Sequence, residues 1–351
     1  MIERITSAQN PKIKHLLALQ EKSRLRREEG LFVVEGRREL EHCLAAGFQL
    51  DTLFLCPEIA GLDLPGLAPA GPDPAGPDLT AGPDLPGLNP AGLDLTAGLD
   101  LTAGLNPAGP DRPAGLDPAG CPQPPSDVSL RSTPPFTPFT VPPLPMPRAA
   151  RSSGGWGHPA RIVHVSKEVY AKVAYREGTE GVIAEVRWKE RVLADLLPQG
   201  HAPLIMVLES VEKPGNLGAV LRSADAAGAD GVILCNPLTD LYNPNLIRAS
   251  IGAVFTVPVV ACTSDEAIAW LKENNIRILT AQLQDSAPYY DVDMTCGTAL
   301  VMGTEATGLT DAWRQAADAH ILIPMLGRLD SLNVSVSAAI LLYEAVRQRQ
   351  R

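Results

Sequence analysis

From Pro203 to the C-terminus, short apolar runs alternate with longer amphipathic segments. We predict strands at Leu204–Leu208, Gly231–Leu234, Thr256–Val260, Arg277–Gln282, Ala299–Met302 and His320–Ile323. We predict helices at Leu217–Ala227, Pro244–Gly252, Asp265–Asn274, Asp311–Ala317 and Asn333–Arg349. This alternation indicates an α/β fold, in which a mostly parallel sheet is covered by helices on both faces. Ligands of such sheets bind at the carboxyl ends of the strands, so we look for a site in the loops that follow the strands.

Residues 57–157 are a low-complexity segment rich in proline and glycine, in which the unit GLDLTA occurs twice in a row from Gly92. Proline removes backbone donors and glycine raises the entropic cost of ordering, so neither helices nor central strands are sustained there. We predict a disordered insertion; a repeat solenoid is the alternative, although its repeating units are normally longer. Pro57–Pro147 contains ten acidic and two basic residues, which accounts for most of the net charge of −10. The overall acidity therefore does not exclude an RNA partner.

The segments on either side of this insertion, residues 1–56 and 158–192, indicate two pieces of one small α/β domain. Helices are predicted at residues 10–29, 37–47 and 167–177, and strands at residues 31–36, 50–56, 161–166 and 181–188. The chain's first residues are distinctly basic and end in KSRLRR, Lys22–Arg27. Charged residues on helices usually serve only solvation, but their one-signed density here makes an RNA-facing surface the competing interpretation.

The first polar loop of the C-terminal part is Glu212–Asn216, which follows a predicted strand. Asn216 is a candidate cap for the helix from Leu217, and Gly228 suits the end of that helix. Arg222 lies off the apolar stripe of the helix. It either forms a solvated pair with Asp225, which contributes little, or is a site residue that fixes a phosphate or polarises a hydroxyl group.

Two further loops are rich in glycine and small polar residues. In LVMGTEATGL, Gly303 and Gly308 permit close approach of the backbone to a ligand, and Glu305 supplies a carboxylate. This pattern is not G-x-G-x-x-G, which argues against a dinucleotide site. The third loop joins IPMLGRLD to SLNVSVSAAILLYEAV, where Ser331 and Asn333 are candidate N-caps for the last helix.

In this order, the three loops resemble the three motifs of the SpoU (TrmH-type) branch of the SPOUT RNA methyltransferases. The matching stretches are PGNLGAVLRSA, VMGTEATGL and IPMLGRLDSLNVSVSAA, within a C-terminal domain of residues 200–351. The N-terminal stretches SAQNPKIKHLLAL and FVVEGRRELEHCLAAG are similar to the substrate-binding module of the same family, an RNA-binding α/β domain. The insertion is the departure from the family's pattern.

The resemblance implies a homodimeric enzyme that uses S-adenosylmethionine to methylate a ribose 2′-hydroxyl group in RNA, with the active site at the subunit interface. It implies a trefoil knot in the mostly parallel sheet of the SPOUT domain. It also implies that the cofactor is bound by Gly303, Glu305, Ile323 and Leu332. The catalytic residues that it implies are Arg222, Asn216, Ser331 and Asn333.

The chemistry of the loops is consistent with this reaction. A ribose hydroxyl group is barely acidic, so its proton must be taken or polarised as the oxygen attacks. None of the three loops contains a histidine, and the guanidinium of Arg222 is a poor base because it stays protonated. We therefore expect Arg222 to orient the adjacent phosphate and stabilise the developing alkoxide, with the identity of the proton acceptor left open.

Alternative functions remain at this stage: an RNA-binding protein without catalysis, an enzyme acting on a nucleotide or another small molecule, or a tRNA methyltransferase. The N-terminal module resembles that of the ribosomal RNA methyltransferases more than the tRNA-specific branch, and this resemblance favours ribosomal RNA over tRNA. No apolar run reaches the roughly 18 residues that span a bilayer, and the N-terminus has no signal-peptide core. The six cysteines lack metal-ligand spacing. We expect a cytoplasmic protein with reduced thiols and no metal.

Overall fold

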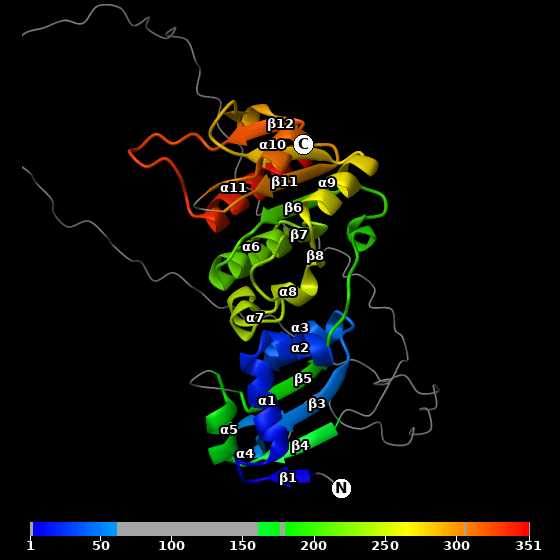
Figure 1. Cartoon of the computed structure of the whole chain (residues 1–351), viewed down its shortest axis with the longest axis vertical. Helices are drawn as coiled ribbons and strands as arrows, with labels where there is room; N and C mark the ends of the chain where they lie inside the picture. Colours follow the sequence, from blue (N-terminus) through cyan, green and yellow to red (C-terminus); the bar gives the residue numbers. More distant parts are fainter. Residues whose placement is uncertain (1–2, 62–160, 176–179, 305–306, 351) are drawn as a thin grey trace, which may run out of the picture. The chain divides into compact units, whose positions relative to one another are not determined.

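The computed structural model describes residues 3–61, 161–175, 180–304 and 307–350, which form two sheets with their helices (Figure 1). The predicted insertion falls almost wholly outside the described residues. Its first residues differ from the prediction, because Pro57–Ala60 form a short helix, α4. Proline suits this first turn, since its fixed φ is compatible with a helix start.

The five-stranded sheet combines residues from both sides of the insertion. Its order is β1-β4-β3-β5-β2, and its strands are β1 (Glu3–Ile5), β2 (Leu31–Glu35), β3 (Leu50–Leu55), β4 (Arg161–Val165) and β5 (Val182–Arg187). The two strands that follow the insertion lie inside this sheet: β4 is parallel to β1 and β3, and β5 is antiparallel to β2 and β3. Both flanking segments therefore contribute strands to one sheet.

The helices of this part are α1 (Pro11–Glu21), α2 (Ser23–Glu29), α3 (Arg37–Ala45) and α5 (Lys167–Val173). The prediction of one helix over residues 10–29 is wrong, because Lys22 is extended and separates α1 from α2. The break turns the buried Arg26 back onto the end of α1, where its guanidinium donates to the carbonyls of Leu19 and Gln20. The guanidinium also pairs with Asp240 at 2.7 Å. Tertiary contacts of a buried charge thus override the helical propensity of the sequence.

The C-terminal sheet has seven strands in the order β10-β12-β9-β11-β6-β7-β8, and each neighbouring pair is parallel. The strands are β6 (Leu204–Glu209), β7 (Gly231–Cys235), β8 (Val259–Cys262), β9 (Arg277–Ala281), β10 (Ala287–Pro288), β11 (Thr298–Met302) and β12 (Ala319–Leu322). The predicted α/β class and parallel pairing are confirmed.

The predicted strand Thr256–Val260 is displaced, because Ala253–Thr256 form helix α8 and the strand β8 begins only at Val259. Gly252, with φ of 83°, begins this helix, and Pro258 restricts the preceding Val257 to an extended conformation. Two short 3₁₀ helices, η1 (Leu193–Leu196) and η2 (Tyr289–Asp291), were not predicted either.

Helices cover both faces of the seven-stranded sheet (Figure 1). They are α6 (Pro214–Ala226), α7 (Pro244–Ser250), α9 (Ser264–Glu273), α10 (Asp311–Ala316) and α11 (Val334–Arg349). Alternate residues of β6 take part in two separate cores: Met206 packs in the cluster that includes α6 and α11, and Val207 packs in the cluster that includes α9 and α10. Within the described ranges, no helix is long and apolar enough to cross a membrane.

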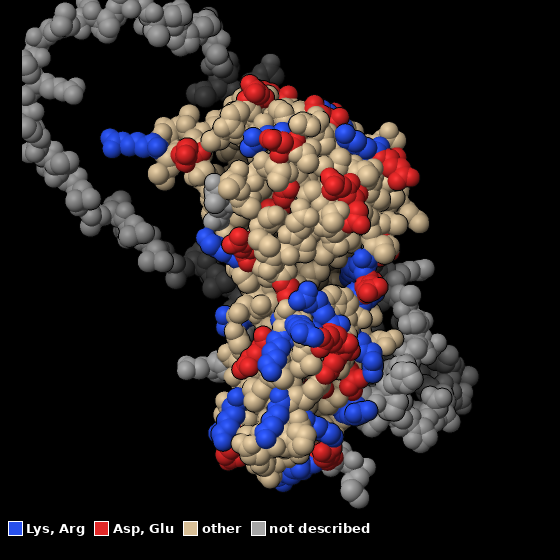
Figure 2. Space-filling view, in the orientation of Figure 1, with Lys and Arg blue, Asp and Glu red and all other residues tan. Residues whose placement is uncertain are grey.

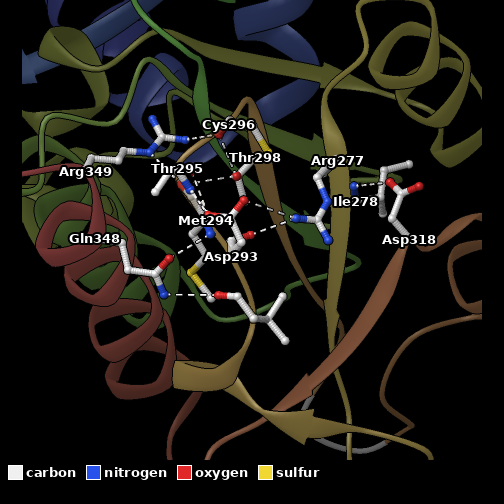
Figure 3. A network of polar contacts seen from close by, with 11 residues as sticks. Arg277, Ile278, Asp293, Met294, Thr295, Cys296, Thr298, Asp318, Gln348 and Arg349 are labelled. Carbon is white, nitrogen blue, oxygen red and sulfur yellow. Dashed lines mark hydrogen bonds and ion pairs between the residues drawn. The ribbon is translucent and has the colours of Figure 1, made fainter. Parts of the chain in front are cut away.

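The carboxyl end of α11 is tied to the segment before β11 (Figure 3). Arg349 donates to four backbone carbonyls, those of Ala202, Pro203, Met294 and Cys296, at 2.7 to 2.9 Å. Burial lowers the pKa of this guanidinium. Because α11 begins at the third motif loop, this anchor holds the helix that carries part of the candidate site.

Candidate active site

The loop after β6 leads into helix α6, which begins at Pro214 rather than at the predicted Leu217. Proline at the first helical position needs no backbone donor, which explains the earlier start. Lys213 therefore takes the N-cap position, without a side-chain cap. Asn216 lies in the first turn, and the prediction that it caps the helix is wrong. Gly228 follows the helix end with φ of 65°, as predicted.

The side chain of Asn333 joins the first and third motif loops. Its Oδ1 accepts hydrogen bonds from Ser335, at 2.9 Å from the backbone nitrogen and 2.6 Å from Oγ, so it caps α11 as predicted. Its Nδ2 donates to Oδ1 of Asn216 at 3.2 Å. Ser331 is not a cap; its hydroxyl donates to Asp330, and the residue is exposed.

Two neighbouring cavities lie near the motif loops. The larger cavity, of about 450 Å³, opens at the carboxyl ends of β9, β11 and β12. Three predicted cofactor residues, Gly303, Ile323 and Leu332, line it, together with Ser331 and Asn333. The fourth predicted cofactor residue, Glu305, lies outside the described residues. The structure thus brings two of the three motif loops around one cavity.

Gly303, in the wall of this cavity, packs directly against the backbone of Gly308 and Leu309. A Cβ atom at this position would clash with the backbone of Gly308 and Leu309. Thr304 and Gly308 exchange two backbone hydrogen bonds, at 3.1 and 3.3 Å, and Gly308 has a positive φ of 68°. Only glycine meets both requirements without strain, so the two glycines define this tight turn.

A second cavity of about 270 Å³, the smaller cavity, lies at the loop after β6. Its lining includes Ser210, Lys213 and Asn216 from that loop and the first turn of α6. Gly303, Thr304 and Val334 line both cavities. The turn at Gly303 and Thr304 is therefore a shared wall, and ligands bound on its two sides lie close to one another.

Arg222 is exposed on α6 and is absent from the lining of both cavities. It makes no hydrogen bond or ion pair with another residue of the described part of the chain. The alternative pair with Asp225 does not form either; the carboxylate of Asp225 accepts from the hydroxyl of Thr256 at 2.6 Å. Arg222 is thus the one predicted catalytic residue that a single chain does not bring to the site.

Lys213 and Gln282 are among the lining residues that the sequence did not predict as site residues. Gln282 Nε2 donates to the carbonyl of Gln284 at 2.9 Å, which fixes the orientation of the amide. Its Oε1 is buried and has no hydrogen-bond partner among the residues that the structure describes. A buried acceptor without a donor is costly, so the larger cavity favours a ligand that brings a donor group. Glutamine in a loop has no distinctive sequence signal.

Lys and Arg side chains gather over the part of the molecule that carries α1, α3 and α5 (Figure 2). Fewer basic side chains cover the helices of the seven-stranded sheet on the face shown. Among residues whose positions are described, no group of three or more His, Cys, Asp or Glu could hold a metal ion. Five of the six cysteines are described and free, three of them buried, and Cys121 lies outside the described ranges.

Comparison with known families matches two parts of the chain. Residues 203–343 match the SpoU rRNA Methylase family, and residues 10–65 match the MRM3-like substrate binding domain. The first match contains all three motif loops and both cavities. The second begins one residue before α1 and covers the strands β2 and β3.

Curated relatives cover about half of the chain. The 23S rRNA (guanosine-2'-O-)-methyltransferase RlmB of Photorhabdus laumondii is 39% identical over 175 residues, which cover 48% of this chain and 72% of the relative. The 23S rRNA (guanosine(2553)-2'-O)-methyltransferase RlmP of Bacillus subtilis is 32% identical over 179 residues, 51% of this chain and 70% of the relative.

Solved structures extend the similarity to nearly the whole chain. A crystal structure of an RNA 2'-O ribose methyltransferase is 32% identical, has a TM-score of 0.63 and covers 99% of this chain and 100% of its own. An AdoMet-bound rRNA methyltransferase from Sinorhizobium meliloti shares the fold, with a TM-score of 0.67 at 23% identity over 99% of this chain and 98% of its own.

Proposed function

The chain belongs to the SpoU rRNA methylase family, and we propose that it transfers a methyl group from S-adenosylmethionine to a ribose 2′-hydroxyl group of 23S ribosomal RNA. The observation that carries this proposal is the pair of cavities that share the wall at Gly303 and Thr304. One cavity suits the methyl donor and the other the acceptor nucleotide. The relatives that are named 23S rRNA methyltransferases favour ribosomal RNA over tRNA, and such a substrate implies a cytoplasmic enzyme.

The residues of the larger cavity fit S-adenosylmethionine. Ile323 and Leu332 supply apolar surface for a flat adenine ring, and Gly303 places backbone in the wall of the cavity. The partnerless Oε1 of Gln282 can accept from an amino or hydroxyl group of the cofactor. When bound, S-adenosylmethionine supplies an electrophilic methyl group on a positively charged sulfur.

The protein's own contribution is to place and polarise the acceptor hydroxyl group. Asn216, held by Asn333, lines the smaller cavity and can hydrogen bond to the ribose. Ser331 lines the larger cavity close to this pair. We assign to Arg222 the orientation of the adjacent phosphate and the stabilisation of negative charge on the attacking oxygen. The acceptor of the proton is left open between Arg222 and a water molecule.

We propose that a second copy of the chain brings Arg222 to the candidate site. Its guanidinium lies outside both cavities of its own chain, so a partner is needed to bring an arginine and a cavity together. Helix α11 carries apolar side chains that a partner could cover, since Val336 is 47% exposed and Tyr343 is 51% exposed, two turns apart. We therefore propose a homodimer with the active site at its interface, and a trefoil knot formed by the loops after β11 and β12.

The five-stranded part, residues 1–56 with 158–192, is proposed as the RNA substrate-binding module and residues 200–351 as the methyltransferase domain. The family match over residues 10–65 and the basic surface in Figure 2 support this division. A ribosomal RNA substrate requires such a surface, because phosphate contacts supply much of the affinity for nucleic acids. Residues 57–157 remain a separate insertion in this scheme.

The proposal is tested with the purified full chain, labelled S-adenosylmethionine and separate preparations of 23S rRNA and tRNA that lack 2′-O-methyl groups. Digestion to nucleosides should yield a labelled 2′-O-methyl nucleoside from 23S rRNA only. Label in tRNA would instead support the tRNA alternative. RNA binding without label in either RNA would indicate a protein that retains the fold without catalysis.

A further inference from the structure

The last residue of β6, Glu209, carries a buried carboxylate that the mechanism above does not use. Its exposed fraction is 2%. Three hydrogen bonds reach it, each 2.9 Å long: Oε1 accepts from the hydroxyls of Ser264 and Thr310, and Oε2 accepts from the backbone nitrogen of Thr310. A buried carboxylate is tolerated when neighbouring donors satisfy its oxygens, as they do here.

The direction of these hydrogen bonds is fixed by the groups around Ser264. Its Oγ accepts from Trp313 Nε1 at 3.1 Å and from Asn236 Nδ2 at 3.0 Å. Both groups are donors only, so the remaining hydroxyl proton of Ser264 points to Glu209. The carboxylate is therefore the common acceptor of a network that reaches β7, α9 and α10 and contains the fully buried Trp313.

Thr310 links this network to the wall between the two cavities. It follows Gly308 and Leu309, whose backbone lies so close to Gly303 that no side chain fits between them. A shift of Thr310 must therefore move the Gly303 turn. The residue after Glu209, Ser210, lines the smaller cavity. Glu209 is therefore connected to both cavities: through Thr310 to the shared wall at Gly303, and through the next residue, Ser210, to the smaller cavity.

We propose that Glu209 is a positioning residue: by fixing Thr310 it holds the backbone of Gly308 and Leu309 against Gly303, in the arrangement that binds the cofactor. Glu209 itself is absent from the lining of either cavity. The identity of the ligand rests on the proposed function. A purely structural carboxylate would lower the stability of the fold and leave the affinity of the folded protein for its cofactor unchanged.

Two substitutions separate these roles. Glu209→Gln keeps the length and an oxygen that can accept from the Thr310 backbone, whereas Glu209→Met keeps the length and removes every acceptor. The dissociation constant of S-adenosylhomocysteine is measured by calorimetry at a temperature where each variant is folded, alongside the thermal midpoint without ligand. We expect Glu209→Met to bind about tenfold more weakly or worse, because the Thr310 donors lose their buried partner. Glu209→Gln should stay within about threefold of wild type, since one such bond is retained.

The matched control is Glu185→Met, which removes a carboxylate of similar burial, 5% exposed, from the five-stranded sheet. It should lower the thermal midpoint and leave the dissociation constant unchanged. If Glu209→Met fails to fold, Thr310→Val replaces it, with Thr310→Ser as its conservative partner; Val should weaken binding several-fold and Ser should not. Wild-type affinity in a folded Glu209→Met or Thr310→Val overturns the positioning role alone. A wild-type chain that does not bind S-adenosylhomocysteine overturns the proposed function, and the inference with it.

Discussion

Asn333 donates a hydrogen bond to Asn216 across 117 positions of the sequence. The same side chain caps helix α11 through its Oδ1, so its two polar atoms serve two different loops. An amide supplies a donor and an acceptor at once, which neither a serine hydroxyl nor a carboxylate supplies in the same geometry. The first turn of α6 and the start of α11 are therefore locked together at the candidate site.

Because Asn333 caps α11 through Oδ1 and donates to Asn216 through Nδ2, a substitution can remove the second hydrogen bond and keep the cap. Asn333→Asp keeps an acceptor for the α11 cap but replaces the donor that faces Asn216 with an oxygen. We expect the thermal midpoint to stay near that of wild type and methyl transfer to fall about tenfold, as for the loss of one site hydrogen bond. Asn333→Ala removes the cap as well and should cost about 1 kcal/mol of stability. Wild-type turnover by a folded Asn333→Asp would show that a donor at position 333 is not needed.

Arg222→Ala should abolish methyl transfer while the affinity for S-adenosylhomocysteine survives, because the arginine does not line the larger cavity. Single-turnover transfer and calorimetry check the two parts of this expectation. The matched control is Arg248→Ala, which removes an exposed arginine from the neighbouring helix α7 and should leave transfer intact. Turnover at the wild-type rate in Arg222→Ala would remove Arg222 from the mechanism.

The dimer proposal predicts that a charge on the exposed stripe of α11 separates the subunits. Tyr343→Asp and Val336→Asp should each produce a monomer in analytical ultracentrifugation and lose methyl transfer, since an unpaired carboxylate is costly in an apolar interface. Leu238→Asp is the control, because Leu238 is 64% exposed and lies outside α11, in the loop between β7 and α7. A wild-type chain that sediments as a monomer at the concentration of the activity assay would contradict the proposal directly.

Local sequence signals explain which features could be predicted. The cap at Asn333, the glycines of the second motif loop and the alternation of strands and helices depend on residues close together in the chain. The cavity positions of Gly303, Ile323 and Leu332 followed from the family resemblance. The break at Lys22 was not predictable, because it depends on the burial of Arg26 against Asp240. The hydrogen bonds around Glu209 join four segments that are far apart in the sequence, so no local sequence pattern predicts them.

The anchor at the end of α11 predicts a large effect on stability (Figure 3). Arg349→Met leaves four backbone carbonyls without their donor, so the free energy of unfolding should fall by about 3 kcal/mol. Arg347→Met is the control two residues away, since Arg347 pairs with Glu344 within the helix and its side chain is 43% exposed. Its loss should cost less than the loss of Arg349, because Gln348 still donates to the same carboxylate of Glu344. Equal losses in urea unfolding of the two variants would contradict the anchor.

His15 predicts a pH dependence of stability in the five-stranded part. Its ring nitrogens lie 3.1 Å from Glu185 and 2.6 Å from Glu29. Burial alone lowers the pKa of His15, but the hydrogen bonds to Glu29 and Glu185 outweigh it and raise the pKa above 6.5. A folded-state pKa above the unfolded value means that the stabilisation is complete below pH 6.5 and is lost as the pH rises through the folded value. Burial raises the pKa of Glu185, which acts in the same direction. Urea unfolding of wild type between pH 6 and pH 8.5 should therefore show a decline in stability that His15→Asn reduces, and an identical decline in both proteins would exclude His15 as its source.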